Sequence, residues 1–313
     1  MARIIKPHKV GAGSRIAVIA PSGPPKPERL QKGSKYFRDL GYQLKIYPQV
    51  KIRTGYLAGD DIARASAIND AFRDKSIDGI FAARGGYGCL RLLPYIDFDS
   101  IKKNPKVFVG YSDLTVLLLA FYAKCDLTAF HGPMLSIEFG KPLRKYTASY
   151  FHRSIEESKP LGAIAVPDSY NLITINKGSV SGPLIGGNLS LIARMIGTGY
   201  LPSFRDKLVF IEDTEEEPYR LDAYLSQLFQ ATDFTKAKGY IIGEMTKTEP
   251  KYGRTKSWTA LEVIKDYFVG LKKPTIYSFP CGHGREKITI PIGVNAYLDA
   301  DKKLLEIREA GVV

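Results

Sequence analysis

The stretch from Lys106 to Tyr122 most constrains the fold of this chain, because it joins a strand to a helix almost without a loop. Val107–Val109 has the composition of a buried strand, and Val116–Tyr122 is an apolar run at helical spacing. The four residues Gly-Tyr-Ser-Asp lead from one to the other, so a tight turn must place Ser112 at its apex. Such a turn lifts the hydroxyl clear of the backbone and aims the next amide the same way, at the positive end of a helix.

This turn predicts a nucleophile elbow at Ser112. The usual Gly-x-Ser-x-Gly pattern is incomplete, because Leu114 stands where the second glycine would be. The alternative is an ordinary helix N-cap, since Ser-Asp before an apolar run is also typical of a cap.

Strands and helices alternate from residue 14 to about residue 125. This alternation predicts a parallel sheet with helices on both faces. Ligands of such sheets bind at the carboxyl ends of the strands, where both the Arg84–Gly88 loop and Ser112 fall. The strands are expected at 14–21, 42–48, 77–83 and 106–110, and the helices at 28–40, 60–73 and 88–93.

The pattern changes after about residue 160. Asp168–Ser181 is polar, irregular and rich in turn residues, which predicts a linker or lid. Beyond it, short strands and tight turns predict a second, largely β domain with a hairpin of Val294–Leu298 and Lys303–Ile307. We therefore expect an α/β protein with a parallel-sheet, flavodoxin-like N-terminal domain (residues 1–165), a linker (166–182) and a smaller, strand-rich C-terminal domain (183–313). The other elements expected in the C-terminal part are helices at 189–197 and 219–230 and strands at 207–211, 239–245, 275–279 and 288–291.

Composition narrows the classes of function. The net charge is +13, but lysines and arginines are scattered among acids, which favours a solvated basic surface or a general attraction for small anions over nucleic-acid binding. The sequence has no run of about 18 apolar residues, so no membrane span is predicted. No signal peptide is recognisable at the N-terminus. Cys89, Cys125 and Cys281 are odd in number and far apart, which indicates a reducing compartment and no metal site. We expect a cytoplasmic protein without a metal or cofactor.

The loop Arg84–Gly88 follows a predicted strand, as a phosphate-binding loop would. It lacks the Gly-x-Gly-x-x-Gly spacing and the lysine of a P-loop, so a nucleotide site is disfavoured. The loop either offers a bare backbone N–H to a substrate oxygen beside Ser112, or is a glycine turn without a ligand.

A serine nucleophile needs an accessible imidazole as its base and a third group to orient that base. His283 has glycines on both sides in a loop after a predicted strand, whereas His131 is either structural or part of a pocket wall. Glu212 and Asp213 end an apolar strand, where an unpaired acid costs free energy, so either one could accept the histidine N–H. The residue pattern alone leaves the choice between these two acids open.

Taken together, the motifs of this sequence resemble those of the LD-carboxypeptidase family, serine peptidases that include the microcin C self-immunity proteases. Their order and spacing cover nearly the whole chain. The matching segments are Ile16–Ser22, Ala83–Gly88, Val109–Thr115, His131–Pro133, Gly186–Leu189, Phe210–Asp213, Pro218–Asp222, Gly282–His283 and Thr289–Gly293.

The resemblance implies roles for individual residues. Ser112 matches the nucleophile, Glu212 the triad acid and His283 the base, and this match favours Glu212 over Asp213. The amides of Gly86 and Asp113 match the oxyanion hole. Asn188 and Tyr87 are candidate substrate contacts, and no metal is implied. Members of the family are commonly homodimers.

The resemblance also implies the reaction: cleavage between an L-centre and a terminal D-residue, as in murein tetrapeptides released during cell-wall recycling. Immunity-type members instead accept aminoacyl-nucleotides and carry a tryptophan in a longer loop before the Gly-Gly-Asn motif. Here that segment holds Tyr170 but no tryptophan, since the single one is Trp258, which favours murein peptides. A non-catalytic binder of cell-wall peptides and a nucleic-acid-binding module are the alternatives from other classes.

Overall fold

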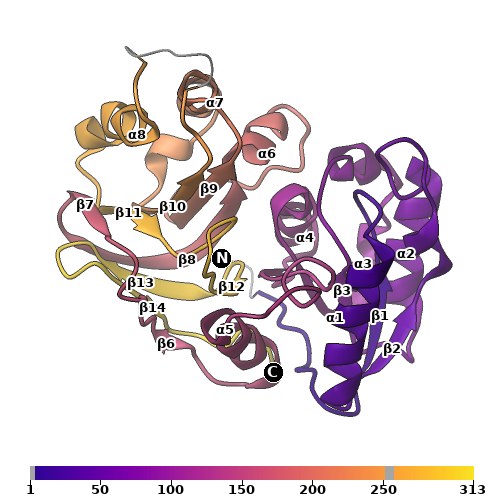
Figure 1. Ribbon diagram of the computed structural model, residues 1–313. Helices are drawn as coiled ribbons and strands as arrows, with labels where there is room; N and C mark the ends of the chain where they lie inside the picture. Colours follow the sequence, from indigo (N-terminus) through magenta and orange to yellow (C-terminus); the bar gives the residue numbers. More distant parts are fainter. Residues whose placement is uncertain (1–3, 251–256) are drawn as a thin grey trace. The chain divides into compact units, whose positions relative to one another are not determined.

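The computed structural model describes residues 4–250 and 257–313, which divide into two compact units (Figure 1). The N-terminal unit consists of Met1–Lys159, Ile288–Gly293 and Ala310–Val313, and the C-terminal unit of Pro160–Lys287 and Val294–Glu309. Both units combine strands with helices, as the predicted α/β class requires. The observed boundary lies near residue 160, but two late segments of the chain return to the N-terminal unit, which differs from the continuous domains expected from the sequence.

The N-terminal unit is a doubly wound α/β fold. Its sheet has the order β12-β5-β4-β3-β1-β2, and β1 to β5 all run parallel. The order 2-1-3-4-5 is that of flavodoxin-like folds, as predicted. The elements are β1 (Arg15–Ile19), α1 (Pro27–Asp39), β2 (Gln43–Ile46), α2 (Asp61–Arg73), β3 (Gly79–Ala82), α3 (Phe98–Lys103), β4 (Val107–Gly110), α4 (Thr115–Cys125), β5 (Phe130–His131), α5 (Lys145–Glu156) and β12 (Ile290–Pro291).

Strand β12 is a correction to the sequence-based prediction, which placed residues 288–291 in the C-terminal domain. Ile290 instead pairs with His131, and β12 forms the edge of the N-terminal sheet as its antiparallel strand. An edge position suits Pro291, which has no N–H to donate to a further strand. Ile288, Ile290 and Ile292 are fully buried, so burial of apolar side chains accounts for the return of the chain.

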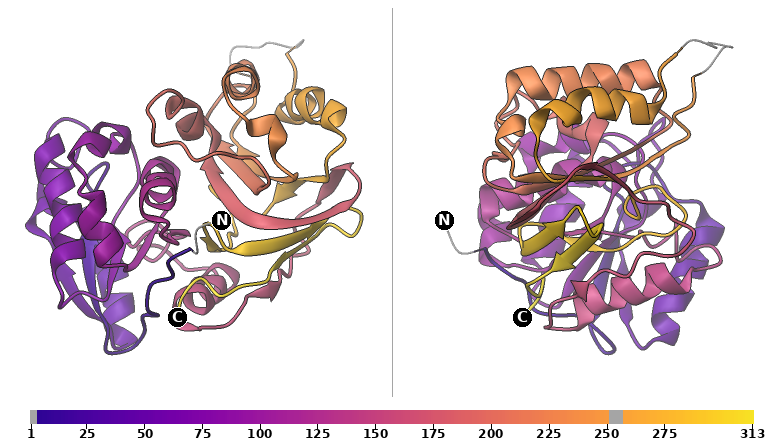
Figure 2. Two further views of the ribbon diagram at one scale, coloured as in Figure 1. Left: turned by 180° about the vertical axis from the view of Figure 1, so that it is seen from behind. Right: turned by 90° about the vertical axis from the view of Figure 1, so that its left-hand side faces the viewer.

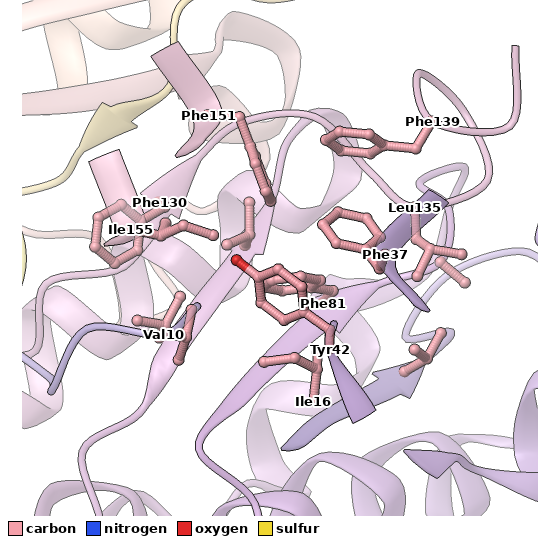
Figure 3. Packing of buried hydrophobic residues seen from close by; sticks show 14 of the residues in the cluster. Val10, Ile16, Phe37, Tyr42, Phe81, Phe130, Leu135, Phe139, Phe151 and Ile155 are labelled. Carbon is pink, nitrogen blue, oxygen red and sulfur yellow. The ribbon is translucent and has the colours of Figure 1, made fainter. Parts of the chain in front are cut away.

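Helices cover both faces of the N-terminal sheet. On one face, the ring of Phe37 of α1 is tilted against Phe81 of β3, and the ring of Phe151 of α5 packs edge-on against it (Figure 3). On the other face, Phe108 of β4 contacts the aromatic rings of α2 and α4. Alternate side chains of each strand thus pack against the helices on opposite faces of the sheet. The aromatic cluster around Phe37 forms the centre of the core on the first of these faces.

The C-terminal unit has an eight-stranded sheet in the order β6-β14-β13-β8-β9-β10-β11-β7. Four neighbouring strands, β8 to β11, run parallel, and three helices of the described part of the unit connect them in turn. Figure 2 shows these helices on one face of the sheet. The elements are β6 (Gly162–Ala163), β7 (Ile173–Asn176), β8 (Ser179–Asn188), α6 (Leu189–Arg194), β9 (Leu208–Thr214), α7 (Pro218–Ala231), β10 (Gly239–Thr246), α8 (Ala260–Phe268), β11 (Thr275–Phe279), β13 (Asn295–Asp299) and β14 (Leu304–Ile307).

The C-terminal unit is strand-rich, as predicted, and contains the predicted hairpin as β13 and β14. Two features differ from the prediction. The segment expected as a linker, 166–182, contains β7 and the start of β8, both of which belong to the sheet. The centre of the sheet is also parallel, because helices connect its strands: α6 and α7 lie where helices were expected, whereas α8 was not predicted.

No helix among residues 4–250 and 257–313 has both the length and the apolar character required to cross a bilayer.

Replacement of Phe37 by alanine tests the aromatic cluster. Phe37 is fully buried, so Phe37→Ala should lower the free energy of unfolding by about 3–5 kcal/mol, as for other buried aromatic truncations. Lys35→Ala on the same helix is the matched control, because Lys35 is exposed and pairs with exposed Asp39. The control should cost no more than about 0.5 kcal/mol in urea unfolding. Equal losses in both variants would contradict this account of the core.

Candidate active site

Ser112 occupies a strained turn between β4 and α4. Its φ is +64°, in the left-handed region that non-glycine residues rarely adopt, and a short 3₁₀ turn, Ser112–Leu114, leads directly into the helix. Strain of this kind is typical of a nucleophile elbow and is not a feature of an ordinary N-cap, whose backbone is extended. A Cβ on Gly110 would lie 2.8 Å from Cγ of Leu114, so Leu114 occupies the space that the glycine leaves. The missing second glycine of the motif is therefore compatible with the turn.

The glycine loop after β3 lies against Ser112. A Cβ added to Gly85 would lie 3.5 Å from Oγ of Ser112, and Gly86 has a φ of +132°. Both positions thus bring bare backbone close to the serine. In the described part of the chain, the backbone N–H groups of Gly86 and Asp113 have no hydrogen-bond acceptor, which suits donors kept for a substrate oxygen.

The side chain of Asp113 ties this loop to its neighbours. The carboxylate is almost completely buried and accepts hydrogen bonds from Oγ of Ser22 (2.6 Å) and the backbone N–H of Cys89 (2.9 Å). One buried carboxylate therefore connects the elbow with the loops after β1 and β3. The family resemblance implied a role for the amide of Asp113, whereas nothing in the sequence pointed to this role of its side chain.

Glu212 and His283 form the second part of the candidate site, in the C-terminal unit. Glu212 lies near the carboxyl end of β9, and His283 lies in the loop after β11. Nδ1 of His283 is 2.7 Å from Oε2 of Glu212, and the backbone N–H of His283 donates to the same oxygen at 3.2 Å. Glu212 is fully buried, whereas the histidine side chain keeps 18% of its surface exposed. This arrangement leaves Nε2 as the nitrogen that can act on another group.

Glycines make room for this pair. Gly282 has a φ of +86°, and a Cβ there would lie 2.2 Å from Oε2 of Glu212. A Cβ on Gly243 of β10 would lie 3.0 Å from Cβ of Glu212. A Cβ on Gly284 would overlap the carboxylate of Glu244, whose Oε2 would be only 1.3 Å away. The glycines flanking His283 thus allow two carboxylates to approach the loop.

The environment of His283 shifts its pKa. Burial lowers the pKa of the imidazole, but the charge of Glu212 and the hydrogen bond to it outweigh burial, so the pKa of His283 rises above 6.5. The stabilisation from this protonated histidine is therefore present below pH 6.5 and is lost as the pH rises through the raised pKa.

The structure separates the roles of the two neighbouring acids. Asp213 accepts hydrogen bonds from Nδ2 of Asn188 (2.9 Å) and the backbone N–H of Ser190 (2.8 Å), and has none with His283. Burial, followed by the charge of Glu212, raises the pKa of Asp213 to about 7. Glu212 is thus the acid that contacts the histidine, which is the choice that the family resemblance favoured.

The two candidate substrate contacts differ in exposure. Tyr87 is 48% exposed, and its ring packs edge-on against the exposed ring of Tyr56. Asn188 is 3% exposed, and its side chain caps α6 through Leu191 and bonds to Asp213. The Nδ2 group of Asn188 also donates to Oε1 of Glu212 at 3.4 Å, so Asn188 lies beside the candidate acid, and its role as a substrate contact stays a prediction.

A further pair beside His283 was not found by sequence analysis. The hydroxyl of Tyr170 donates to Oε2 of Glu244 at 2.8 Å, and burial raises the pKa of Glu244. The sequence signal for this pair was the glycine at position 284, which leaves space beside the loop of His283. The local sequence could not predict which carboxylate would fill that space. No cluster of potential metal ligands occurs among the described residues.

Comparisons with known proteins identify the family. Residues 16–132 match the LD-carboxypeptidase N-terminal domain, and residues 181–298 match the LD-carboxypeptidase C-terminal domain. The chain belongs to the LD-carboxypeptidase family. It is therefore a peptidase by family, and the motif segments quoted above fall largely within these two regions.

Three similar proteins illustrate the range of the family. The chain is 36% identical to a probable murein peptide carboxypeptidase of Bacillus subtilis strain 168, over 98% of this chain and 95% of that protein. The crystal structure of a muramoyltetrapeptide carboxypeptidase from Oxalobacter formigenes is 28% identical, with a TM-score of 0.82 over 94% of this chain and 97% of that one. The microcin C7 self-immunity protein MccF in complex with aspartyl sulfamoyl adenosine is 26% identical, with a TM-score of 0.90 over 99% and 100%.

The charge of Glu212 is predicted to control the pKa of His283. Glu212→Gln keeps the shape of the side chain but removes its charge, so burial should dominate and the pKa of His283 should fall below 6.5. An NMR titration of the imidazole measures this change. Glu306→Gln, a change at a partly exposed residue of β14 that pairs with Arg308, is the control and should leave the pKa of His283 unaltered. An unchanged pKa in Glu212→Gln would contradict the proposed pairing.

The substitution Gly282→Ala tests whether the Glu212–His283 pair requires the space that this glycine leaves. Gly197→Ala is a matched control, because Gly197 has a similar φ of +81° but no atom within 4 Å of the added Cβ. Both variants should lose about 1–2 kcal/mol from the left-handed backbone. Only Gly282→Ala should also displace the Glu212–His283 pair and reduce peptidase turnover, by about 100-fold. Comparable turnover in the two variants would show that this contact is unimportant.

Proposed function

We propose that this protein is a serine LD-carboxypeptidase that removes the terminal D-alanine from murein tetrapeptides through an acyl-enzyme. The observation that carries the proposal is the 2.7 Å contact between Nδ1 of His283 and a buried carboxylate oxygen of Glu212. This pair has the geometry of the base and orienting acid of a serine peptidase. The strained turn at Ser112 supplies a nucleophile of the matching type.

In the first step, Nε2 of neutral His283 takes the proton of Ser112 as its hydroxyl oxygen attacks the carbonyl carbon of the last peptide bond. Glu212 holds the imidazole by its Nδ1–H and stabilises the imidazolium that forms. The oxyanion accepts hydrogen bonds from the amides of Gly86 and Asp113, each worth roughly 3 kcal/mol in the transition state.

In the second step, the imidazolium of His283 gives its proton to the departing nitrogen, and the C–N bond breaks to release D-alanine. His283 then takes a proton from water, which attacks the ester formed with Ser112. Collapse of the second tetrahedral species returns the proton to Ser112 and frees the shortened peptide. No cofactor takes part in this sequence.

This mechanism predicts a direction of pH dependence. The base must be neutral to accept the serine proton, so kcat/KM should rise with pH through the pKa of His283. Because Glu212 raises that pKa above 6.5, the increase should be centred above 6.5.

Aminoacyl-nucleotides are the second candidate substrates, and the similarity to MccF in complex with aspartyl sulfamoyl adenosine is the observation that favours them. Two features favour murein peptides instead. The segment Asp168–Ser181 has no tryptophan to stack on a base. Its Tyr170 has its hydroxyl bound to Glu244 and to the backbone of Glu286.

The proposal places the enzyme in cell-wall recycling, in the cytoplasm and as a homodimer, with the murein peptide as its partner. A non-catalytic binder of cell-wall peptides would not require the oriented imidazole of His283, so we favour catalysis.

The free tetrapeptide L-Ala-D-Glu-meso-diaminopimelate-D-Ala is the test substrate. We expect mass spectrometry to show loss of the last residue with wild-type protein, and at least about 1,000-fold slower loss with Ser112→Ala. An aminoacyl sulfamoyl adenosine, incubated in parallel, tests the second candidate. Full D-alanine release by Ser112→Ala would refute the proposed chemistry, and binding of the tetrapeptide without turnover by wild-type protein would support the binding protein.

A further inference from the structure

A carboxypeptidase must recognise the free carboxylate at the end of its substrate. In a peptide cut before its last residue, this carboxylate lies about one residue length, roughly 4 Å, from the carbonyl that is attacked. The group that holds the carboxylate must therefore lie close to the nucleophile. An arginine suits this role best, because its planar guanidinium can donate two parallel hydrogen bonds to a carboxylate.

The switch point of the N-terminal sheet lies between β1 and β3, where the strand order reverses and ligands of such folds bind. The loops after these two strands are joined here, since the N–H of Gly23 donates to the carbonyl of Gly85 at 3.3 Å. Gly85 in turn lies next to Ser112. Glycines occupy positions 23, 85 and 86, so no side chain from these positions fills the space beside the serine.

Arg84 is the cation of this glycine loop. Its Cζ would be 4.0 Å from a Cβ added to Gly23, which places the guanidinium over the loop after β1. Nη1 donates to the carbonyl of Pro24 at 3.0 Å, and this bond fixes the guanidinium beside the loop. A guanidinium has five N–H donors, so most of those of Arg84 remain for a ligand. The residue is exposed.

The charge of Arg84 is also uncompensated. Within the described residues it makes no ion pair with a carboxylate. The nearby arginines are different: Arg64 is fully buried and bonds to Asp61 and to the carbonyl of Pro21, and Arg91 forms two hydrogen bonds with Asp61. Unlike Arg64 and Arg91, Arg84 thus has no carboxylate partner among the described residues and is available to an anionic ligand.

We infer that Arg84 binds the terminal carboxylate of the substrate and so restricts the enzyme to peptides with a free C-terminus. This inference rests on the proposed function and names the residue that selects the substrate class. Arg84 acts in binding and orientation, and the chemical steps remain with Ser112 and His283.

The test compares two peptides, the free tetrapeptide and the same peptide with a C-terminal amide, which lacks the charge. In wild-type protein the acid should be preferred in kcat/KM. Arg84→Gln should lower kcat/KM for the acid by about 30- to 3,000-fold, the range for loss of one partner of a close charge pair. The same variant should change kcat/KM for the amide by less than about threefold, because the amide carries no charge for Arg84 to bind. Arg84→Lys, which keeps the charge but loses the paired donors, should recover part of the activity on the acid.

Arg91→Ala is the matched control, since it removes a neighbouring exposed arginine that is already paired with Asp61. It should leave the preference for the acid over the amide unchanged. If circular dichroism shows Arg84→Gln to be unfolded, Arg84→Lys decides the question by a loss of about tenfold or more on the acid alone.

Retention of the wild-type preference in a folded Arg84→Gln would overturn the assignment of Arg84 while leaving the peptidase proposal intact. Equal hydrolysis of the two peptides by wild-type protein would also overturn it. Absence of D-alanine release from both peptides by wild-type protein would instead reject the proposed function, together with the inference that depends on it.

Discussion

The hydrogen bond between the buried carboxylate of Glu212 and the imidazole of His283 is the interaction on which the candidate site depends. A carboxylate without exposure to water is costly unless hydrogen bonds compensate it, and here both the ring and the backbone of His283 donate to one oxygen. The contact fixes the loop after β11 and the orientation of the ring together. It also explains why the residue before His283 is a glycine, since a side chain there would occupy the place of the carboxylate.

The N-terminal unit also contains a buried carboxylate that is compensated by hydrogen bonds. Asp113 is buried, and its carboxylate accepts a hydrogen bond from the backbone N–H of Cys89, at the end of the glycine loop. Ser22 adds a third segment to this contact. In each unit, one buried carboxylate at or near the end of a parallel strand thus holds a loop that follows another parallel strand. Parallel strands place such loops at one edge of the sheet, and the carboxylates then fix their positions.

Much of this organisation could be predicted from the sequence. The alternation of strands and helices gave the parallel N-terminal sheet, and the short connection around Ser112 gave the elbow. Local pattern could not show that Ile290 and Pro291 return to the edge of this sheet, because their pairing with β5 joins segments about 160 residues apart. It also missed β7, a four-residue strand in which isoleucines alternate with Thr174 and Asn176 and which pairs with β11 from an edge position where burial is incomplete.

The roles of the site residues also could not be fully predicted from local sequence pattern. Two adjacent acids at the end of β9 are equivalent in sequence, but a strand points successive side chains to opposite faces, and only Glu212 points toward the loop of His283. Likewise, the place of Asn188 after two glycines gave no sign that its side chain caps α6 and donates to Asp213 and Glu212. Roles that depend on which distant residue fills a local space could not be predicted from residue types alone.

Covalent trapping of the nucleophile tests the central claim most directly. A fluorophosphonate that phosphonylates activated serines should modify the protein once, with the adduct on Ser112 in peptide mapping by mass spectrometry. The rate of modification should increase with pH through the pKa of His283 and should fall by at least about 100-fold in His283→Ala. An adduct on another residue, or equally fast modification of Ser112 in His283→Ala, would contradict the account.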